Sequence, residues 1–123
     1  VLRQELLRPP SKLDFILWGW AVSYRAGHTQ GLHVHPGANV SGVYYVSAPP
    51  STLEPGDFGK ISFYDPRPRA TMIQLPNQVN RHRVAPTPGD MYLFPSWLEH
   101  SVSAFQGEGE RLCIAFNAKL IVE

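Results

Sequence analysis

Short apolar segments, each bounded by Gly, Pro or Asn, make up most of the chain after Pro9 and Pro10. Beyond this proline pair no window of adequate length shows a convincing helical period, so we interpret the segments as strands. The predicted strands are 13–24, 31–35, 41–46, 60–64, 71–75, 81–85, 91–94, 101–105 and 111–122. Many short strands at roughly 8 to 12 residue spacing are typical of an all-β sandwich or barrel, and a jelly roll is the compact form that fits this length.

Composition supports one domain spanning residues 1–123. Hydrophobic residues at 43% and charged residues at 17% are typical of a globular protein. Lys and Arg number 11 against 10 Asp and Glu, so the charge balance does not favour a nucleic-acid partner. The single Cys113 excludes an internal disulfide, and the longest apolar run, 15–22, is too short for a membrane span. We therefore expect a soluble, cytoplasmic protein.

The beginning of the chain carries a further expectation. The sequence starts at Val1 rather than Met, and Leu2, Leu6 and Leu7 lie on one side of segment 1–8. This segment is predicted to be the end of a helix that packs under a sheet, with an N-terminal helical portion missing before it. A homodimer is left open.

Three histidines carry the candidate chemistry. His33 and His35 lie two residues apart in predicted strand 31–35, so their imidazoles are expected on the same face. His100 ends the stretch 88–100, which is interpreted as a turn, an apolar strand, a second turn and the start of the next strand. Three imidazoles with open coordination positions are typical of a catalytic iron, zinc, copper or nickel site. The pattern favours a metal site.

A structural role is the alternative for each histidine taken singly, because a lone histidine is more often a hydrogen-bonded core or surface group. The pairing of His33-x-His35 with a distant His100 favours metal binding over that alternative. His28 and His82 have no such partners, and we interpret them as ordinary residues.

Several strings in the chain resemble the core of the iron(II) and 2-oxoglutarate-dependent oxygenases, and in particular their prolyl-hydroxylase-like branch. The strings are 33–36, 41–46, 59–63, 65–67, 84–86, 89–98, His100 and 110–117. They are most similar to a bacterial and phage group of oxygenases within that superfamily. Each string alone is weak, whereas their order and spacing from about residue 32 to 117 are fairly specific. The resemblance implies a double-stranded β-helix, which is the jelly-roll fold of these enzymes.

The resemblance implies a ligand set position by position. His33 and His100 match the two metal histidines of the family, and His35 lies where most members have an acidic ligand. Three neutral histidines leave the ferrous ion more positive than two histidines and a carboxylate do. Three-histidine iron sites exist in other dioxygenases, so Fe(II) on His33, His35 and His100 is the expected centre. The replacement leaves open whether activity is retained.

The same resemblance implies a cosubstrate site. Arg111 lies where the family has the basic residue that holds the distal carboxylate of 2-oxoglutarate, because a guanidinium pairs bidentately with a carboxylate. Cys113 takes the place of a serine hydroxyl, and Tyr45 matches a tyrosine that hydrogen-bonds the same carboxylate. The alternatives are a surface arginine among Glu108 and Glu110, and a core tyrosine, since Tyr44 and Tyr45 face opposite sides of one strand.

The implied activity is a dioxygenase that decarboxylates 2-oxoglutarate to succinate and carbon dioxide and hydroxylates an unidentified substrate. Tyr45, Tyr92 and Trp97 are candidates for the pocket wall, although each residue type is more often core. The sequence does not identify the primary substrate.

Two other readings stay open. A cupin is also a double-stranded β-helix, and Gly89, Pro95 and His100 meet its second motif, with Trp97 in place of a glycine. Asn39 or Val40 stands at the glutamate of its first motif. A cupin would use the same three histidines but has no standing need for Arg111. The second alternative is a non-catalytic β-sandwich binding module in which the histidines are incidental or hold a structural ion.

Overall fold

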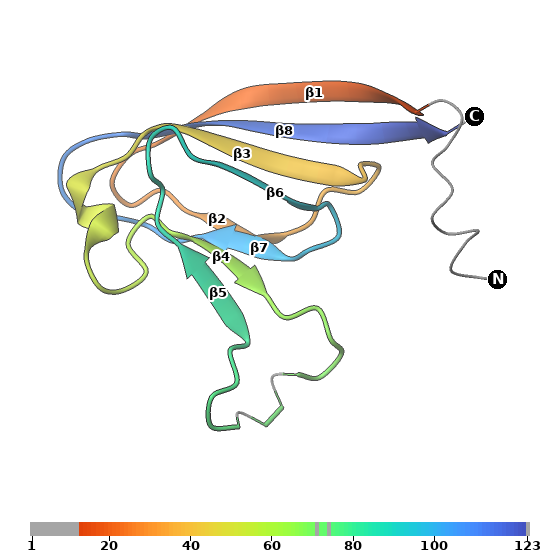
Figure 1. Cartoon of the computed structure of the whole chain (residues 1–123). Coiled ribbons are helices and arrows are strands. Elements are labelled where there is room, and N and C mark those ends of the chain that lie inside the picture. The colour runs from red at the N-terminus through yellow and green to blue at the C-terminus, as the bar shows by residue number, and fades with distance from the viewer. Residues whose placement is uncertain (1–12, 71, 74, 123) are drawn as a thin grey trace.

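The computed structural model describes residues 13–70, 72–73 and 75–122 (Figure 1). Its strands are β1 (Leu13–Tyr24), β2 (Gln30–His33), β3 (Val40–Ser47), β4 (Ile61–Tyr64), β5 (Arg81–Val84), β6 (Met91–Pro95), β7 (His100–Val102) and β8 (Arg111–Val122), with a short 3-10 helix, η1, at Pro50–Leu53. The all-β prediction is confirmed. The expected helical end at 1–8 lies outside the described residues. No helix within the described ranges is long and apolar enough to cross a membrane.

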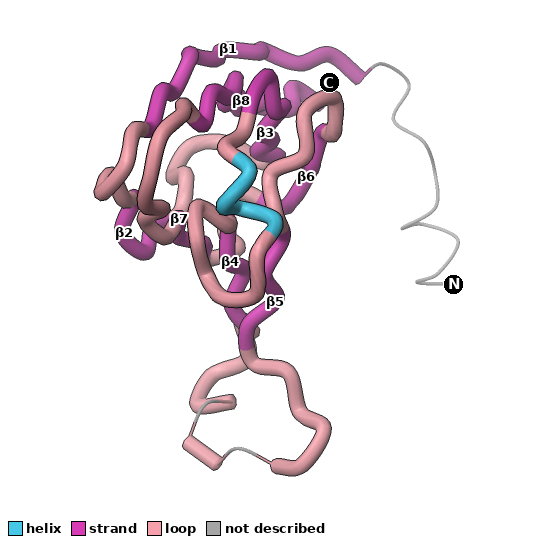
Figure 2. The backbone as a smooth tube through the Cα atoms, turned by 90° about the vertical axis from the view of Figure 1, so that its left-hand side faces the viewer, coloured by secondary structure: helices cyan, strands magenta, loops and turns pink. Residues whose placement is uncertain are grey.

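Two four-stranded antiparallel sheets face each other. The first has the strand order β1-β8-β3-β6 and the second β2-β7-β4-β5, and together they form the expected double-stranded β-helix. The two layers are visible in Figures 1 and 2. Strand β8 pairs with both β1 and β3, and β7 pairs with both β2 and β4. The strands that carry Arg111 and His100 are therefore held on both sides.

Alternation along β3 defines the core. Val43 and Tyr45 point into the space between the sheets and are buried, whereas Tyr44 and Val46 are exposed on the outer side. The buried cluster consists of Val43, Tyr45, Ile61, Val102 and Cys113. Because both sheets contribute to this cluster, its packing sets the spacing of the layers that enclose the candidate site.

The predicted strand at 71–75 is wrong. The described residues Met72, Ile73 and Leu75 form no strand and are exposed, in a connection between β4 and β5 that projects from the barrel (Figure 2). The amide of Ala70 donates to Arg67, and that of Met72 donates to Arg69. These backbone groups are satisfied by local turns, so the apolar composition of the segment did not produce a strand.

A tight turn leads into β6. Pro88 and Gly89 are its central residues, Gly89 has φ +92°, and the Asp90 amide donates to the Thr87 carbonyl at 3.0 Å. Proline at the second position and a positive φ at the third are the features of a type II turn. The Gly89 amide also donates to the Tyr45 carbonyl at 2.9 Å, so the turn is fastened to β3.

Replacing Gly89 by alanine is expected to lower the free energy of unfolding by about 1 kcal/mol, because a Cβ disfavours the left-handed backbone. No atom lies within 4 Å of that Cβ, so the cost comes from the backbone alone. Urea unfolding measures it. Gly31→Ala is the control, because Gly31 has open space and no positive φ. Equal stability of both variants would contradict the account of the turn.

Candidate functional site

The three histidines meet at one end of the barrel. The ligand atoms of His33, His35 and His100 all lie within 4.8 Å of one another, and Nε2 of His35 is 3.1 Å from Nε2 of His100. Two nitrogens bound at right angles to one metal, each at about 2.1 Å, would lie about 3 Å apart. The spacing therefore fits a shared metal ion.

The imidazole of His35 lies near that of His33, but His35 does not belong to the predicted strand 31–35. Strand β2 ends at His33, which pairs with His100 across the second sheet, and His35 lies in the loop that follows. The ring centroids of His33 and His35 are nevertheless 5.0 Å apart. The loop, rather than the alternation of a strand, brings the second imidazole to the site.

Two of the rings are oriented by the backbone. Nδ1 of His33 donates to the Gly31 carbonyl at 2.7 Å, and Nδ1 of His100 donates to the Leu98 carbonyl at 2.8 Å. A carbonyl only accepts, so these bonds place the proton on Nδ1 and leave a lone pair on Nε2. This second interaction of a ligating imidazole is typical of protein metal sites.

Burial keeps two of the rings neutral. It lowers the pKa of His100 to about 4, against a weaker opposing effect of the bond to Leu98. Burial also lowers the pKa of His35, and the neighbouring His33 lowers it further. A neutral imidazole is the form that binds metal, so these two ligands need no deprotonation at neutral pH.

Arg111 is a buried cation. Only 1% of the residue is exposed, and among the described residues no acidic side chain forms an ion pair with it. Glu110, the acidic neighbour in sequence, instead accepts a hydrogen bond from Ser23. The alternative of a surface arginine is thus wrong.

Neutral groups surround the guanidinium. Its Nη2 donates to the Tyr45 hydroxyl at 3.3 Å, Nη1 donates to the Cys113 sulfur at 3.7 Å, and Nε has no partner. The rings of Tyr24 and Tyr45 lie with their centroids 5.1 Å from its central carbon. Burial raises the pKa of Tyr45 to about 12, so that hydroxyl stays protonated. Tyr24, the β1 partner of Arg111, was missed in the sequence analysis because nothing in a β1 pattern singles it out.

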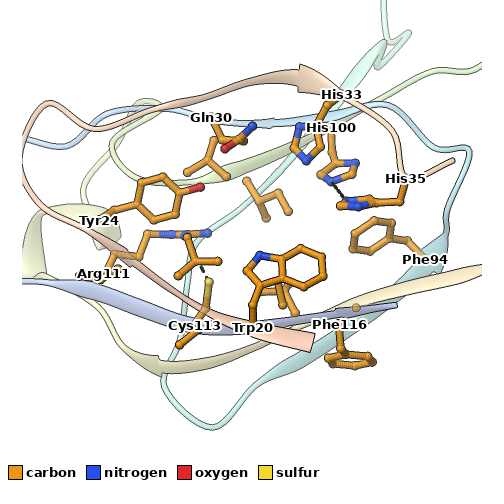
Figure 3. Close-up of a pocket in the computed structure, with 18 residues that line it drawn as sticks. Trp20, Tyr24, Gln30, His33, His35, Phe94, His100, Arg111, Cys113 and Phe116 are labelled. Atoms are coloured by element: carbon orange, nitrogen blue, oxygen red, sulfur yellow. Dashed lines mark hydrogen bonds between the residues drawn. The ribbon is translucent and has the colours of Figure 1, made fainter. Parts of the chain in front are cut away.

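One cavity joins the two groups. It has a volume of about 510 Å³ and reaches from the three histidines to Arg111, as Figure 3 shows. Trp20 and Phe94 line it near the histidines, and Tyr24 and Cys113 line it near the arginine. The fold therefore brings a candidate metal centre and a buried cation to a common space.

The other predicted residues lie outside this cavity. Tyr45 contacts Arg111 without lining the cavity, and Tyr92 packs against Tyr45 in the core. Trp97 is 62% exposed on the turn between β6 and β7. His28 and His82 do not join the histidine cluster, as expected. Tyr92 and Trp97 are thus not part of the cavity wall, and Trp20 and Phe94 take that place.

Comparison with known proteins assigns the family. Residues 19–117 match the family model described as "Putative 2OG-Fe(II) oxygenase". The chain belongs to this family. No curated protein matches the sequence.

Two solved structures share the fold. One is an oxidoreductase of the 2OG-Fe(II) oxygenase family from Burkholderia pseudomallei, with a TM-score of 0.64, 13% identity and coverage of 89% of this chain and 47% of that one. The other is a Pseudomonas putida prolyl-4-hydroxylase, with a TM-score of 0.56, 21% identity and coverage of 94% and 56%. The chain spans about half the length of these structures.

Replacing His100 by alanine is expected to weaken Fe(II) binding by more than about 100-fold, since loss of a group that merely orients a ligand already costs 10- to 100-fold. Anaerobic titration with Fe(II) measures the affinity. His82→Ala is the control, because His82 is exposed on β5 and lies outside the cluster. Native affinity in the His100 variant would exclude it as a ligand.

Proposed function

We propose that this domain is an Fe(II)- and 2-oxoglutarate-dependent dioxygenase that hydroxylates a C–H bond of a substrate not yet identified. The observation that carries the proposal is a buried Arg111, without an acidic partner among the described residues, in the same cavity as three neighbouring histidines. When bound, iron and 2-oxoglutarate supply the oxidising chemistry, in which dioxygen is consumed and the oxoacid leaves as succinate and carbon dioxide.

The three histidines fit a ferrous ion. Imidazole is an ordinary ligand for iron, and the three histidines line a cavity that has room for a chelating cosubstrate. With His35 in place of an acidic residue, the protein ligands add no negative charge. The keto-acid carboxylate of the cosubstrate would bring one negative charge to the ion, while its distal carboxylate pairs with Arg111.

Arg111 is the group for the far end of the cosubstrate. A buried guanidinium without an anion is costly, and a carboxylate would satisfy its charge and offer acceptors for its N–H groups. The Tyr45 hydroxyl, which lies outside the cavity, accepts a hydrogen bond from Nη2 and helps to orient the guanidinium. Burial raises the pKa of Cys113, so its thiol offers only a weak donor where a hydroxyl would be stronger.

The remaining wall residues provide an apolar entrance. Trp20 lies next to His35, with ring centroids 6.2 Å apart, and Phe94 lies 4.8 Å from His100. These rings would give a substrate an apolar wall beside the three histidines. Their apolar character suits an uncharged part of the substrate.

The cupin alternative is less well supported. It shares the three histidines and the fold, but it gives no reason for a permanently charged side chain at the bottom of the cavity. The non-catalytic binding module is weaker still, because three imidazole nitrogens within 4.8 Å of one another are an unnecessary arrangement for an inert core.

Partners and location extend the proposal. We infer that 2-oxoglutarate is the small-molecule partner, that no nucleic acid is bound, and that a homodimer is compatible with the site. Arg81 and Arg83 on the edge strand β5 pair with Asp57, and Arg67 in the preceding loop pairs with Asp65. These arginines are therefore partly neutralised within the chain, which does not favour a nucleic-acid partner. With one cysteine and no disulfide, the domain is expected to work in the cytoplasm.

Replacing Arg111 by alanine is expected to weaken 2-oxoglutarate binding by about 2 to 5 kcal/mol and leave Fe(II) affinity nearly unchanged, because a charge pair is truncated while the metal ligands stay. Arg111→Lys should keep only part of the 2-oxoglutarate affinity, since an ammonium group cannot pair with a carboxylate in the bidentate geometry of arginine. Calorimetric titration of the iron-loaded variants with 2-oxoglutarate measures the cosubstrate affinity, and titration of the metal-free variants with Fe(II) measures the metal affinity. Arg83→Ala, which removes a surface ion pair, is the control. A flat titration of the native protein would refute the oxygenase and leave the metal site intact.

Replacing His35 by aspartate is expected to preserve Fe(II) binding, because a carboxylate at this position completes the commoner ligand set. His35→Ala should lose most of the affinity. Fe(II) titrations of the two variants, run beside the native protein, test this. If both variants bind iron like the native protein, His35 is not a ligand.

A further inference from the structure

The loop that carries His35 is fastened to the turn after β6 through Ser96. His35 lies beyond the end of β2, so no strand ladder holds its backbone. Its amide donates instead to the Ser96 carbonyl at 2.9 Å. Four residues on, the Asn39 carbonyl accepts from the Ser96 amide at 3.1 Å. Both backbone groups of Ser96 therefore hold the same loop, one at the metal-ligating residue itself.

Ser96 also begins the turn that leads to His100. Its neighbour Pro95 accepts a hydrogen bond from the Leu98 amide at 2.9 Å, which closes the turn between β6 and β7. The Leu98 carbonyl in turn accepts from Nδ1 of His100 at 2.8 Å. A displacement of Ser96 would thus move the supports of two of the three candidate ligands.

Two buried polar side chains, those of Ser41 and Asn117, hold Ser96 in place. Its hydroxyl lies 2.7 Å from that of Ser41, and the Ser41 hydroxyl donates to Oδ1 of Asn117 at 2.7 Å. Because the single hydroxyl proton of Ser41 is donated to Asn117, the Ser96 hydroxyl donates to the Ser41 oxygen. Ser96, Ser41 and Asn117 are 2%, 1% and 5% exposed. The chain of bonds crosses from the turn to β3 and then to β8.

The strands at the end of this chain are the rigid part of the barrel. Ser41 and Asn117 are register partners in the β3–β8 pair, which lies in the middle of the first sheet. The loop of His35 is fastened to β8 as well, since the Asn39 amide donates to Ala118 and the Leu120 amide donates to the Asn39 side chain, both at 2.9 Å. Hydrogen bonds thus connect both the turn and the loop to the same sheet.

We propose that the Ser96–Ser41–Asn117 chain is a positioning device for the metal centre, which sets the places of His35 and His100 relative to His33. The proposal rests on the three histidines binding the metal. None of the three residues touches the metal; each acts through the backbone of Ser96. Loss of one hydroxyl leaves a buried polar group without its partner, and the turn shifts to satisfy it.

The test is Co(II) binding to the full chain, read both as affinity and as the visible ligand-field spectrum, which reports coordination geometry. Ser96→Ala and Ser41→Ala should each weaken Co(II) binding by about 10- to 100-fold and change the spectrum, as expected for residues that orient ligands. The double variant should lose little more than either single variant, because both changes break one chain.

Ser101→Ala is the matched control. Ser101 follows His100 directly, and its hydroxyl makes one hydrogen bond, to Tyr64 at 2.9 Å, outside the chain. This variant should keep the native affinity and spectrum. If it is as impaired as Ser96→Ala, or if Ser96→Ala binds Co(II) like the native protein, the positioning role is wrong.

Two further outcomes are distinguishable. If the native protein binds no Co(II), the metal centre itself is contradicted. If circular dichroism shows that Ser96→Ala is unfolded, Ser41→Cys decides, because it keeps the shape of the side chain and weakens the donor to Asn117. A weakened, spectrally altered site in that variant supports the proposal, and a native one overturns it.

Discussion

The guanidinium of Arg111 carries a permanent positive charge between two sheets, where water does not reach it. Desolvation of such a charge costs several kcal/mol, and the two tyrosine rings beside it offset only part, at roughly 0.5 to 2 kcal/mol each. The missing component is an anion. The cavity provides room for one, and the histidines at its other end define which anion is useful: one that reaches a metal with its opposite end.

The fold explains how this charge is tolerated. Arg111 opens β8, which pairs on one side with β1 and on the other with β3. Tyr24 is its register partner on β1, and Tyr45 is the partner of Cys113, two residues further along β8. The two rings that flank the guanidinium are therefore placed by the pairings of β8 with β1 and β3.

Much of the fold was predictable, because β1 and β8 are bounded by clear turn signals and both strands form with the expected ends. The strand prediction for 71–75 was wrong because strand-like composition does not reveal whether a neighbouring strand is available for pairing. The predicted proximity of His33 and His35 rested on strand alternation. In the structure, the hydrogen bond from the His35 amide to Ser96 holds the loop that brings the two rings together.

The parts of the site that escaped prediction share one property. Tyr24 and the Ser41, Ser96 and Asn117 chain come from separate strands and turns, and each residue type is common in structural roles. Their meaning depends on contacts between residues far apart in sequence, such as Ser41 with Asn117. The three histidines, Arg111, Tyr45 and Cys113 were picked out beforehand, because they lie in strings whose order and spacing together resemble one family.

The central claim is that the three histidines and Arg111 form one site for Fe(II) and 2-oxoglutarate. Anaerobic absorption spectroscopy tests it most directly: 2-oxoglutarate is added to the Fe(II)-loaded native protein and the visible region is recorded. The account predicts a charge-transfer band that needs both iron and the oxoacid and that does not form with succinate, which lacks the chelating keto acid. A spectrum unchanged by saturating 2-oxoglutarate, in protein shown to contain iron, would contradict it.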